Sequence, residues 1–267
     1  MSTPALSMIA PPMSTSSALQ LEGIDFSYLA PSDGVEGPLY QDFSLRIEQG
    51  SIVAIMGTSG AGKSTLGRLM AGIIAPRGGV VRRSTDFTRP SDLVYVDQHP
   101  MNGVFPWQTV VENVRYPLER LRWDGARRRD RICHVMNLFR LGPLANAYPA
   151  QLSGGELQRL ALARCLSWQP KLVILDEPFT ALDSRVKAEI TCALHQLALG
   201  DRLTLVLITH NVSDALALGM RCVVLANRPV RVVSDLAYRT GFPRDENAPD
   251  YDAMQQALIN GIRDGMV

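Results

Sequence analysis

The spacing of hydrophobic residues predicts a chain in which strands and helices alternate. Short, uninterrupted apolar runs are typical of strands buried on both faces, whereas apolar residues three or four positions apart predict amphipathic helices. We expect buried strands at residues 51–56, 93–96, 172–175, 203–208 and 222–225, and helices at residues 66–73, 156–167, 184–199 and 213–218. This alternation predicts an α/β fold with a mainly parallel sheet that is covered on both faces.

Two regions depart from this alternation. Residues 19–47 change between apolar and polar positions in short pieces, which predicts an N-terminal antiparallel β subdomain. Further along, Val110, Val114 and Leu118 belong to a stretch in which apolar residues recur at helical spacing. This stretch predicts an inserted α-helical subdomain over about residues 99–152.

The two ends of the chain differ from its middle in composition. Residues 1–18 are rich in Ser, Thr, Pro and Met, with no basic segment before an apolar run, and predict a disordered tail rather than a signal peptide. The main domain is expected over residues 19–235, and residues 236–267 form a short C-terminal extension.

Composition excludes several classes of protein. No apolar run approaches the roughly 18 residues that a membrane-spanning helix needs, so no segment is expected to cross a membrane. A formal net charge of +1 argues against strong, sequence-independent binding to nucleic acid. The cysteines are widely separated and have neither zinc-site nor disulfide-framework spacing, so we expect buried, reduced thiols in a cytoplasmic protein; they are Cys133, Cys165, Cys192 and Cys222.

A glycine-rich loop between a predicted strand and a predicted helix fits the pattern GxxxxGK[ST]. In such a P-loop the backbone N–H groups point inward at phosphate oxygens, and the helix adds its positive end. Lys63 would neutralise the β- and γ-phosphates, and the Ser64 hydroxyl would bind Mg²⁺. The predicted nucleotide-binding residues of this segment are Gly57, Thr58, Ser59, Gly60, Ala61, Gly62, Lys63, Ser64 and Thr65.

A second candidate segment, which bears two carboxylates, follows the predicted strand at residues 172–175. Asp176 and Glu177 stand at the carboxyl end of this strand, the edge of a parallel sheet at which ligands bind. Asp176 is placed to hold Mg²⁺, usually through water, and Glu177 to act as the general base that activates the attacking water.

A third segment, Ser153, Gly154, Gly155 and Glu156, begins a predicted helix. Ser153 and Glu156 have the spacing of a capping box, and a glycine-rich helix start is also an anion site. Together with the Gln158-Arg159 pair that follows, this segment resembles the signature motif of ATP-binding cassette (ABC) ATPases. The resemblance extends over residues 19–263 and implies a P-loop NTPase core, with ATP and Mg²⁺ as cofactors.

The resemblance also implies roles for residues that carry little information alone. Gln98 matches the Q-loop glutamine, which contacts Mg²⁺ and the catalytic centre, and His210 matches the switch histidine that contacts the γ-phosphate. Tyr28 stands where the family places an aromatic ring against adenine, and residues 181–183 match the D-loop. The sequence departs from the family pattern at Glu156, where glutamine is frequent; since Glu156 also completes the helix cap, we expect activity to survive.

In this family two cassettes pair head to tail, and each ATP lies between the P-loop of one cassette and the signature helix of the other. The resemblance therefore implies that Ser153, Gly154, Gly155 and Glu156 serve the nucleotide of a second subunit. ATP would close the dimer, and hydrolysis would open it.

Residues 105–114, 225–231 and 243–245 resemble the importer ATPases for nitrate, sulfonates and taurine. This implies a peripheral subunit on the cytoplasmic face of the membrane. Its partners would be integral membrane permease subunits and, indirectly, an extracytoplasmic solute-binding protein that delivers a small, anionic solute. The alternatives are an exporter or lipid-transport ATPase, a soluble ABC protein of translation or DNA repair, or a non-enzymatic regulatory cassette.

Two surface features have alternative interpretations. Trp107, in a Pro-Trp turn, either lines a groove that receives a permease helix or packs in the core. Arg127, Arg128 and Arg129, with Arg131, predict a solvated helix face, and the alternative is contact with anionic lipid head groups.

Overall fold

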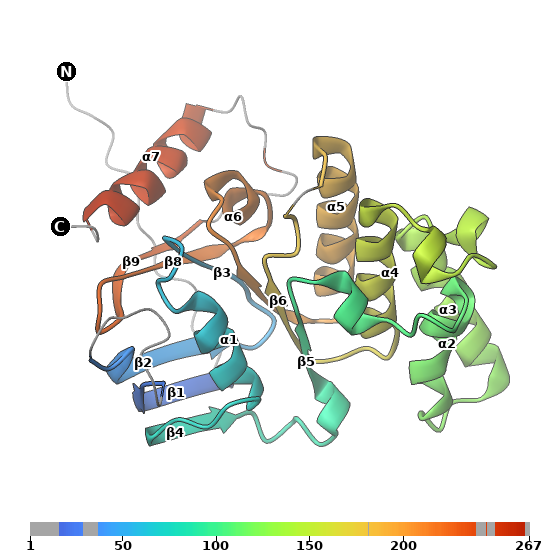
Figure 1. The fold of residues 1–267 in the computed structure, drawn as a ribbon, viewed down its shortest axis with the longest axis horizontal. Helices are drawn as coiled ribbons and strands as arrows, with labels where there is room; N and C mark the ends of the chain where they lie inside the picture. The colour runs from blue at the N-terminus through green and yellow to red at the C-terminus, as the bar shows by residue number, and fades with distance from the viewer. Residues whose placement is uncertain (1–15, 29–36, 181, 239–243, 245–248, 265–267) are drawn as a thin grey trace.

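The computed structural model describes residues 16–28, 37–180, 182–238, 244 and 249–264. Most of the predicted N-terminal tail, Ala181 of the predicted D-loop, and residues 243 and 245 lie outside these ranges. The described part contains two sheets and a group of helices at one end (Figure 1).

The larger sheet has six strands, of which five are parallel and the last is antiparallel. Their spatial order is β5 (Leu93–Val96), β6 (Leu172–Asp176), β7 (Thr204–Ile208), β3 (Ile52–Gly57), β8 (Arg221–Ala226) and β9 (Arg231–Ala237). Along β3, Val53 and Ile55 belong to one hydrophobic core, whereas Ala54 and Met56 belong to the other. Every residue of β3 is buried, as expected for a strand covered on both faces.

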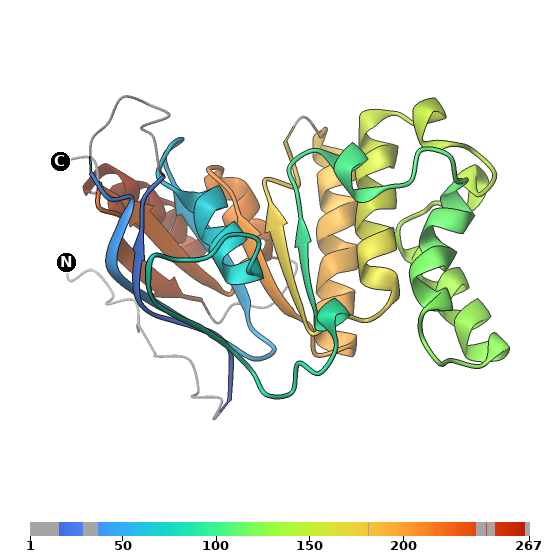
Figure 2. The ribbon, with the colours of Figure 1, turned by 60° about the horizontal axis from the view of Figure 1, so that its bottom comes forward.

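One face of this sheet is covered by a smaller antiparallel sheet and one helix. The small sheet has the order β2 (Tyr40–Glu48), β1 (Ser17–Phe26) and β4 (Gly78–Arg83), and the helix is α1 (Lys63–Ala71). Apolar residues of β1 and β2 share a core with Leu66 and Leu69 of α1. This layer holds α1 between the two sheets (Figures 1 and 2).

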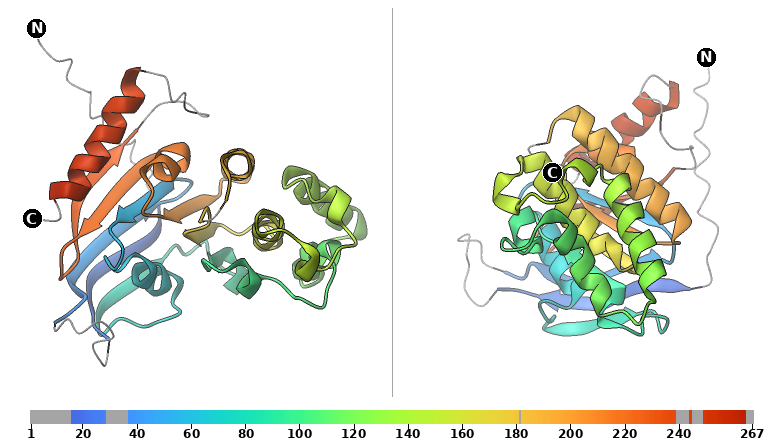
Figure 3. Two further views of the ribbon diagram at one scale, coloured as in Figure 1. Left: turned by 45° about the horizontal axis from the view of Figure 1, so that its top comes forward. Right: turned by 90° about the vertical axis from the view of Figure 1, so that its right-hand side faces the viewer.

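Helices cover the opposite face and continue into the predicted helical insertion. The covering helices are α4 (Gly154–Ser167), α5 (Ser184–Gly200), α6 (Val212–Leu218) and α7 (Pro249–Asp264). The insertion contributes α2 (Val110–Glu119) and α3 (Gly125–Leu138), and short 3₁₀ segments lie at Pro90–Asp92, Pro100–Gly103, Gly142–Leu144 and Pro149–Gln151. Both α2 and α3 contact α4 and lie at the end of the molecule remote from the antiparallel sheet (Figure 3).

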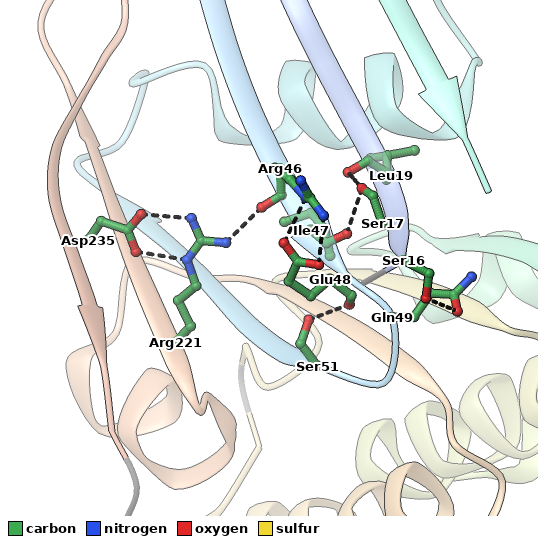
Figure 4. A network of polar contacts seen from close by, with 10 residues as sticks. All are labelled: Ser16, Ser17, Leu19, Arg46, Ile47, Glu48, Gln49, Ser51, Arg221 and Asp235. Carbon is green, nitrogen blue, oxygen red and sulfur yellow. Dashed lines mark hydrogen bonds and ion pairs between the residues drawn. The ribbon is translucent and has the colours of Figure 1, made fainter. Parts of the chain in front are cut away.

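A polar network connects β8 and β9 of the larger sheet to β2 of the smaller sheet. The Arg221 guanidinium donates to both carboxylate oxygens of Asp235, through Nε at 2.8 Å and Nη2 at 2.7 Å. Its Nη1 donates to the backbone oxygen of Arg46 on β2 at 2.7 Å, and Arg46 in turn pairs with Glu48 (Figure 4). The bidentate pair on β8 and β9 therefore also fastens β2.

The predicted α/β fold class, with its mainly parallel sheet and antiparallel β subdomain, is confirmed by this topology. Among the strands and α-helices of the described residues, β4, β9 and α7 were not predicted. The residues of β4 are exposed or half-buried, so no apolar alternation marks this edge strand. Helix α7 lies in the predicted C-terminal extension and buries Tyr251, Met254 and Leu258 against the core. Strand β1 begins at Ser17, inside the predicted disordered tail.

The expected burial of two cysteines and the expected exposure of one arginine are wrong. Cys133 and Cys192 are exposed rather than buried, because they lie on the solvent faces of α3 and α5. Arg131 is buried rather than solvated: its guanidinium donates to the Ser167 carbonyl at 2.9 Å and pairs with Asp201 at 3.0 Å. Among the described residues, no helix is long and apolar enough to span a bilayer.

Candidate nucleotide-binding site

The sheet brings the carboxyl ends of β5, β6, β7 and β3 to one edge. Asp176 of β6 pairs in register with Ile208 of β7, so the residues that follow these two strands are neighbours. Gln98 follows β5, and the glycine-rich loop follows β3 and leads into α1. Segments distant in sequence therefore meet at the edge where ligands bind in open parallel sheets.

The glycine-rich loop requires glycine at its first and last bends. Gly57 has a φ of +156°, and a Cβ there would lie 2.4 Å from the Leu225 carbonyl oxygen. Gly62, the residue before α1, has a φ of +76°, and a Cβ would lie 2.9 Å from the Tyr40 hydroxyl oxygen. Any side chain at these positions would force the loop away from β8 or β2.

Lys63 begins α1 and is buried beneath this loop. Its ammonium group donates to the carbonyl oxygens of Gly57 at 2.9 Å and Thr58 at 2.8 Å. Burial lowers the pKa of Lys63, while the nearby carboxylates of Glu177 and Asp176 oppose that shift. The loop and the buried ammonium group together form a cationic cradle of the kind that binds phosphate.

Asp176 and Ser64 form a pair of oxygen donors beside the cradle. The Ser64 hydroxyl donates to Asp176 Oδ1 at 3.1 Å, and Asp176 is buried. Mg²⁺ prefers oxygen ligands and is usually held by one or two carboxylates together with substrate phosphates and water. This donor set fits Mg²⁺ delivered with a nucleotide, although no group of three or more His, Cys, Asp or Glu among the described residues could bind a metal.

Glu177 and His210 face each other across the ends of β6 and β7. His210 Nδ1 lies 2.8 Å from Glu177 Oε1. Glu177 has a φ of +48°, in the left-handed region that residues other than glycine seldom adopt. Its backbone N–H donates to the Ile208 carbonyl at 2.9 Å. The turn thus holds the carboxylate toward the imidazole, and strained backbone of this kind is concentrated at functional sites.

Most of these groups line one cavity of about 360 Å³. In the cavity wall the Tyr28 hydroxyl shares a hydrogen bond of 2.8 Å with Thr65 Oγ1, and the exposed Tyr28 ring lies edge-on to Phe26. Of the predicted site residues the cavity is lined by Tyr28, Ser59, Gly60, Gly62, Lys63, Ser64, Thr65, Gln98, Glu177 and His210. Gly57, Thr58 and Ala61 shape the loop without lining the cavity, and Asp176 lies beneath Ser64.

Two residues of the cavity wall were not predicted, namely Leu39 and Arg228. Arg228 lies in the turn after β8, and the N–H of Val230 in the same turn donates to the Leu39 carbonyl at 2.8 Å. Only the tertiary pairing of this turn with the start of β2 brings them to the cavity, and no local sequence signal marks either residue.

The predicted signature residues lie apart from this cavity. Ser153, Gly154, Gly155 and Glu156 begin α4, and none of the four is among the residues that line the cavity. The predicted capping box is present, because the Ser153 N–H donates to Glu156 Oε2 at 2.8 Å and the Glu156 N–H donates to Ser153 Oγ at 3.4 Å. The backbone and hydroxyl of Ser153 hold the pKa of Glu156 below its usual value.

A second cleft of about 250 Å³ lies beside the strand that leads to Gln98. Tyr95, Asp97, Arg164 and Trp168 are among its lining residues. Near this cleft Trp107 is 70% exposed, so core packing is excluded for it. Its ring stacks on Phe105 at 5.3 Å, and Phe105 lies under the guanidinium of Arg164 at 4.2 Å.

The family model described as "ABC transporter" matches residues 40–180, more than half of the chain. This chain belongs to the ABC transporter family. The dimeric structure of the bacterial ABC transporter cassette MJ0796 is similar to this cassette, with a TM-score of 0.70 and 29% identity over 84% of this chain and 100% of that one. The similarity therefore extends over the whole of that cassette.

Curated relatives of this cassette are import ATP-binding proteins. The aliphatic sulfonates import ATP-binding protein SsuB 1 of Paraburkholderia xenovorans is 35% identical over 245 residues, covering 92% of this cassette and 67% of that relative. The sulfate/thiosulfate import ATP-binding protein CysA of a Synechocystis strain is 37% identical over 198 residues, covering 72% of this cassette and 55% of that relative. The cassette thus spans about half of the CysA relative.

Proposed function

We propose that this chain is the ATP-binding and ATP-hydrolysing subunit of an ABC importer for a small, anionic solute. The observation that carries the proposal is the Glu177–His210 pair, 2.8 Å apart, on the wall of a cavity that also contains the P-loop and Lys63. Phosphoryl transfer needs a phosphate cradle, a metal ligand and a residue that orients water, and the residues proposed for all three lie at this one edge of the sheet.

Each group has a distinct part in this chemistry. The loop N–H groups and Lys63 bind the phosphates, and Tyr28 supports the adenine ring. Glu177 accepts a proton from the attacking water, and His210 orients Glu177 toward the γ-phosphate end of the cavity. Ser64, Asp176 and Gln98 would hold Mg²⁺, which supplies charge neutralisation for the phosphate oxygens.

The exposed start of α4 supports a head-to-tail pair of cassettes. Ser153, Gly154, Gly155 and Glu156 lie outside the cavity of their own chain, on a capped helix N-terminus suited to phosphate. In the proposed dimer they contact the nucleotide bound by the partner. ATP would then join the two cassettes, and hydrolysis would release them.

The exposed Trp107 and the neighbouring cleft support docking on a membrane permease. An exposed indole that stacks on Phe105 beside a cleft is an aromatic anchor of the kind concentrated at protein interfaces. The cassette would sit on the cytoplasmic face of the inner membrane, with no nucleic acid among its partners. An extracytoplasmic solute-binding protein would deliver the solute, and the named solutes of both relatives, sulfonates and sulfate or thiosulfate, are anions.

The Glu177→Gln variant tests the hydrolytic part of the proposal. Glutamine keeps the size of the side chain but cannot accept the proton, so we expect ATP hydrolysis to fall at least roughly a hundredfold. Nucleotide affinity is retained, and ATP traps a stable dimer. Phosphate release and size-exclusion chromatography with ATP measure the two effects.

Glu119→Gln is the matched control, because Glu119 is an exposed residue of α2 that pairs only with nearby Arg115 in the described ion pairs. It is expected to hydrolyse ATP at the wild-type rate. A Glu177→Gln protein that also hydrolyses at this rate would remove Glu177 from the role of general base.

A further inference from the structure

The buried carboxylate of Asp176 has two hydrogen-bond donors on opposite oxygens. Ser64 donates to Oδ1 at 3.1 Å, and the Tyr95 hydroxyl donates to Oδ2 at 2.6 Å. The second contact is short, as expected for a hydroxyl that donates to an ionised carboxylate. Tyr95 belongs to β5, the strand next to β6, and pairs in register with Ile174.

The position of the Tyr95 ring is fixed from two sides. A Cβ on Gly67 of α1 would lie 3.1 Å from Tyr95 Cε2 and 2.6 Å from Ile208 Cδ1, so the ring packs directly on the helix backbone. On its other side the Tyr95 hydroxyl interacts with the Arg68 guanidinium. Since an ionised carboxylate can only accept, the hydroxyl proton is directed toward Asp176.

The packing of the ring holds its hydroxyl against the Asp176 carboxylate. Tyr95 therefore donates to Oδ2 from a position fixed by α1. Free rotation of the carboxylate would break the contacts with Tyr95 and Ser64 together.

We propose that Tyr95 is a positioning residue for the metal site: it fixes the Asp176 carboxylate so that Oδ1 is presented toward Ser64, and thereby sets the affinity for the divalent cation bound with nucleotide. This inference depends on the proposed function, in which Asp176 and Ser64 hold that cation. Tyr95 itself touches neither nucleotide nor cation. It acts through Asp176, as the hydrogen-bond partners of metal ligands do.

The Tyr95→Phe variant tests this role, since it removes the hydroxyl and keeps the ring on Gly67. Mn²⁺ binding is titrated by electron paramagnetic resonance in the presence of a non-hydrolysable ATP analogue. We expect the Mn²⁺ affinity to fall about tenfold, at the lower end of the effects seen for such supporting residues. Binding of a fluorescent ATP analogue in EDTA is expected to be unchanged, which also shows that the variant is folded.

Three further variants complete the test. Tyr238→Phe removes another half-buried hydroxyl, one that contacts the Met254 carbonyl at 3.5 Å, and is expected to keep wild-type Mn²⁺ affinity. Arg68→Gln, at an exposed position, is expected to lower the affinity less than Tyr95→Phe does. Wild-type affinity in Tyr95→Phe, with affinity lost in Asp176→Asn, would overturn the role of Tyr95 alone. Wild-type affinity in Asp176→Asn would overturn the proposed cation site as well.

Discussion

At the scale of single residues, the proposed catalytic site contains a carboxylate and an imidazole that follow neighbouring strands. The Glu177–His210 contact is formed across β6 and β7, whose paired ends fix the separation of the two side chains. The left-handed backbone at Glu177 adds a local constraint on the carboxylate. Each group therefore orients the other.

Loss of the imidazole should impair the chemical step more than binding. For His210→Ala we expect kcat to fall at least roughly tenfold, because Glu177 loses the partner that orients it, with ATP affinity within about twofold of wild type. Steady-state phosphate release and fluorescent-nucleotide titration separate the two effects. His134→Ala, at an exposed position of α3, is the control. An equal loss of kcat in both variants would contradict this role.

Residues of the site were predictable where a local motif carries the chemistry. The P-loop spacing identifies Lys63 and Ser64, and the polar end of an apolar strand identifies Asp176 and Glu177. Tyr95 and Arg228 could not be found in this way. Their roles depend on which strands and turns are neighbours in space. A lone tyrosine or arginine in the sequence does not indicate which elements will lie beside it.

At the scale of elements, Arg131 connects the helical insertion to the sheet-covering helices. Its Nη2 donates to the Leu166 carbonyl at 2.7 Å and to Asp201 at 3.0 Å, while Nε donates to the Ser167 carbonyl at 2.9 Å. The C-terminal carbonyls of α4 have no donors within their own helix, so a guanidinium from α3 satisfies them. Arg131 therefore links α3, the end of α4 and the end of α5.

Removal of this guanidinium should destabilise the fold. For Arg131→Ala we expect the free energy of unfolding to fall by about 3 kcal/mol, the lower end of the range for breaking a buried ion pair. Urea denaturation measures the loss. Arg129→Ala changes an exposed arginine of the same helix and should stay within about 0.5 kcal/mol of wild type. Equal stability of the two variants would show that the Arg131 contacts contribute little.

Elements were predictable where burial leaves a periodic pattern. The strand at residues 93–96 was predicted with its observed bounds, because both of its ends adjoin polar residues. The Arg127–Arg131 segment shows the limit of such reasoning. A run of arginines predicts a solvated face, and only the packing of α3 against α4 reveals that one member is buried.

At the scale of the whole molecule, two surfaces remain to be matched with partners in the proposed assembly. The start of α4 is available to a second cassette, and Trp107 with its neighbouring cleft is available to a permease. Trp107 is 70% exposed, and Leu199 at the end of α5 is 75% exposed, so the two side chains differ in location rather than in exposure. Comparing alanine variants of the two residues therefore separates a docking role from the general effect of removing an exposed apolar side chain.

For Trp107→Ala we expect ATP hydrolysis by the purified chain to be unchanged, because the indole lies outside the nucleotide cavity. Association with the permease should weaken by about 2 kcal/mol, roughly thirtyfold, as expected for the loss of an aromatic anchor. Leu199→Ala should keep both properties. Wild-type association of Trp107→Ala would exclude this tryptophan as an anchor.

The most direct test of the central claim is co-purification from native membranes. The tagged wild-type chain, isolated in mild detergent, should carry with it a membrane protein with several spanning helices, identified by mass spectrometry. Recovery of that protein should fall for Trp107→Ala and not for Leu199→Ala. Recovery of ribosomal or DNA-repair proteins, with no membrane protein, would contradict the importer assignment and leave the ATPase chemistry intact.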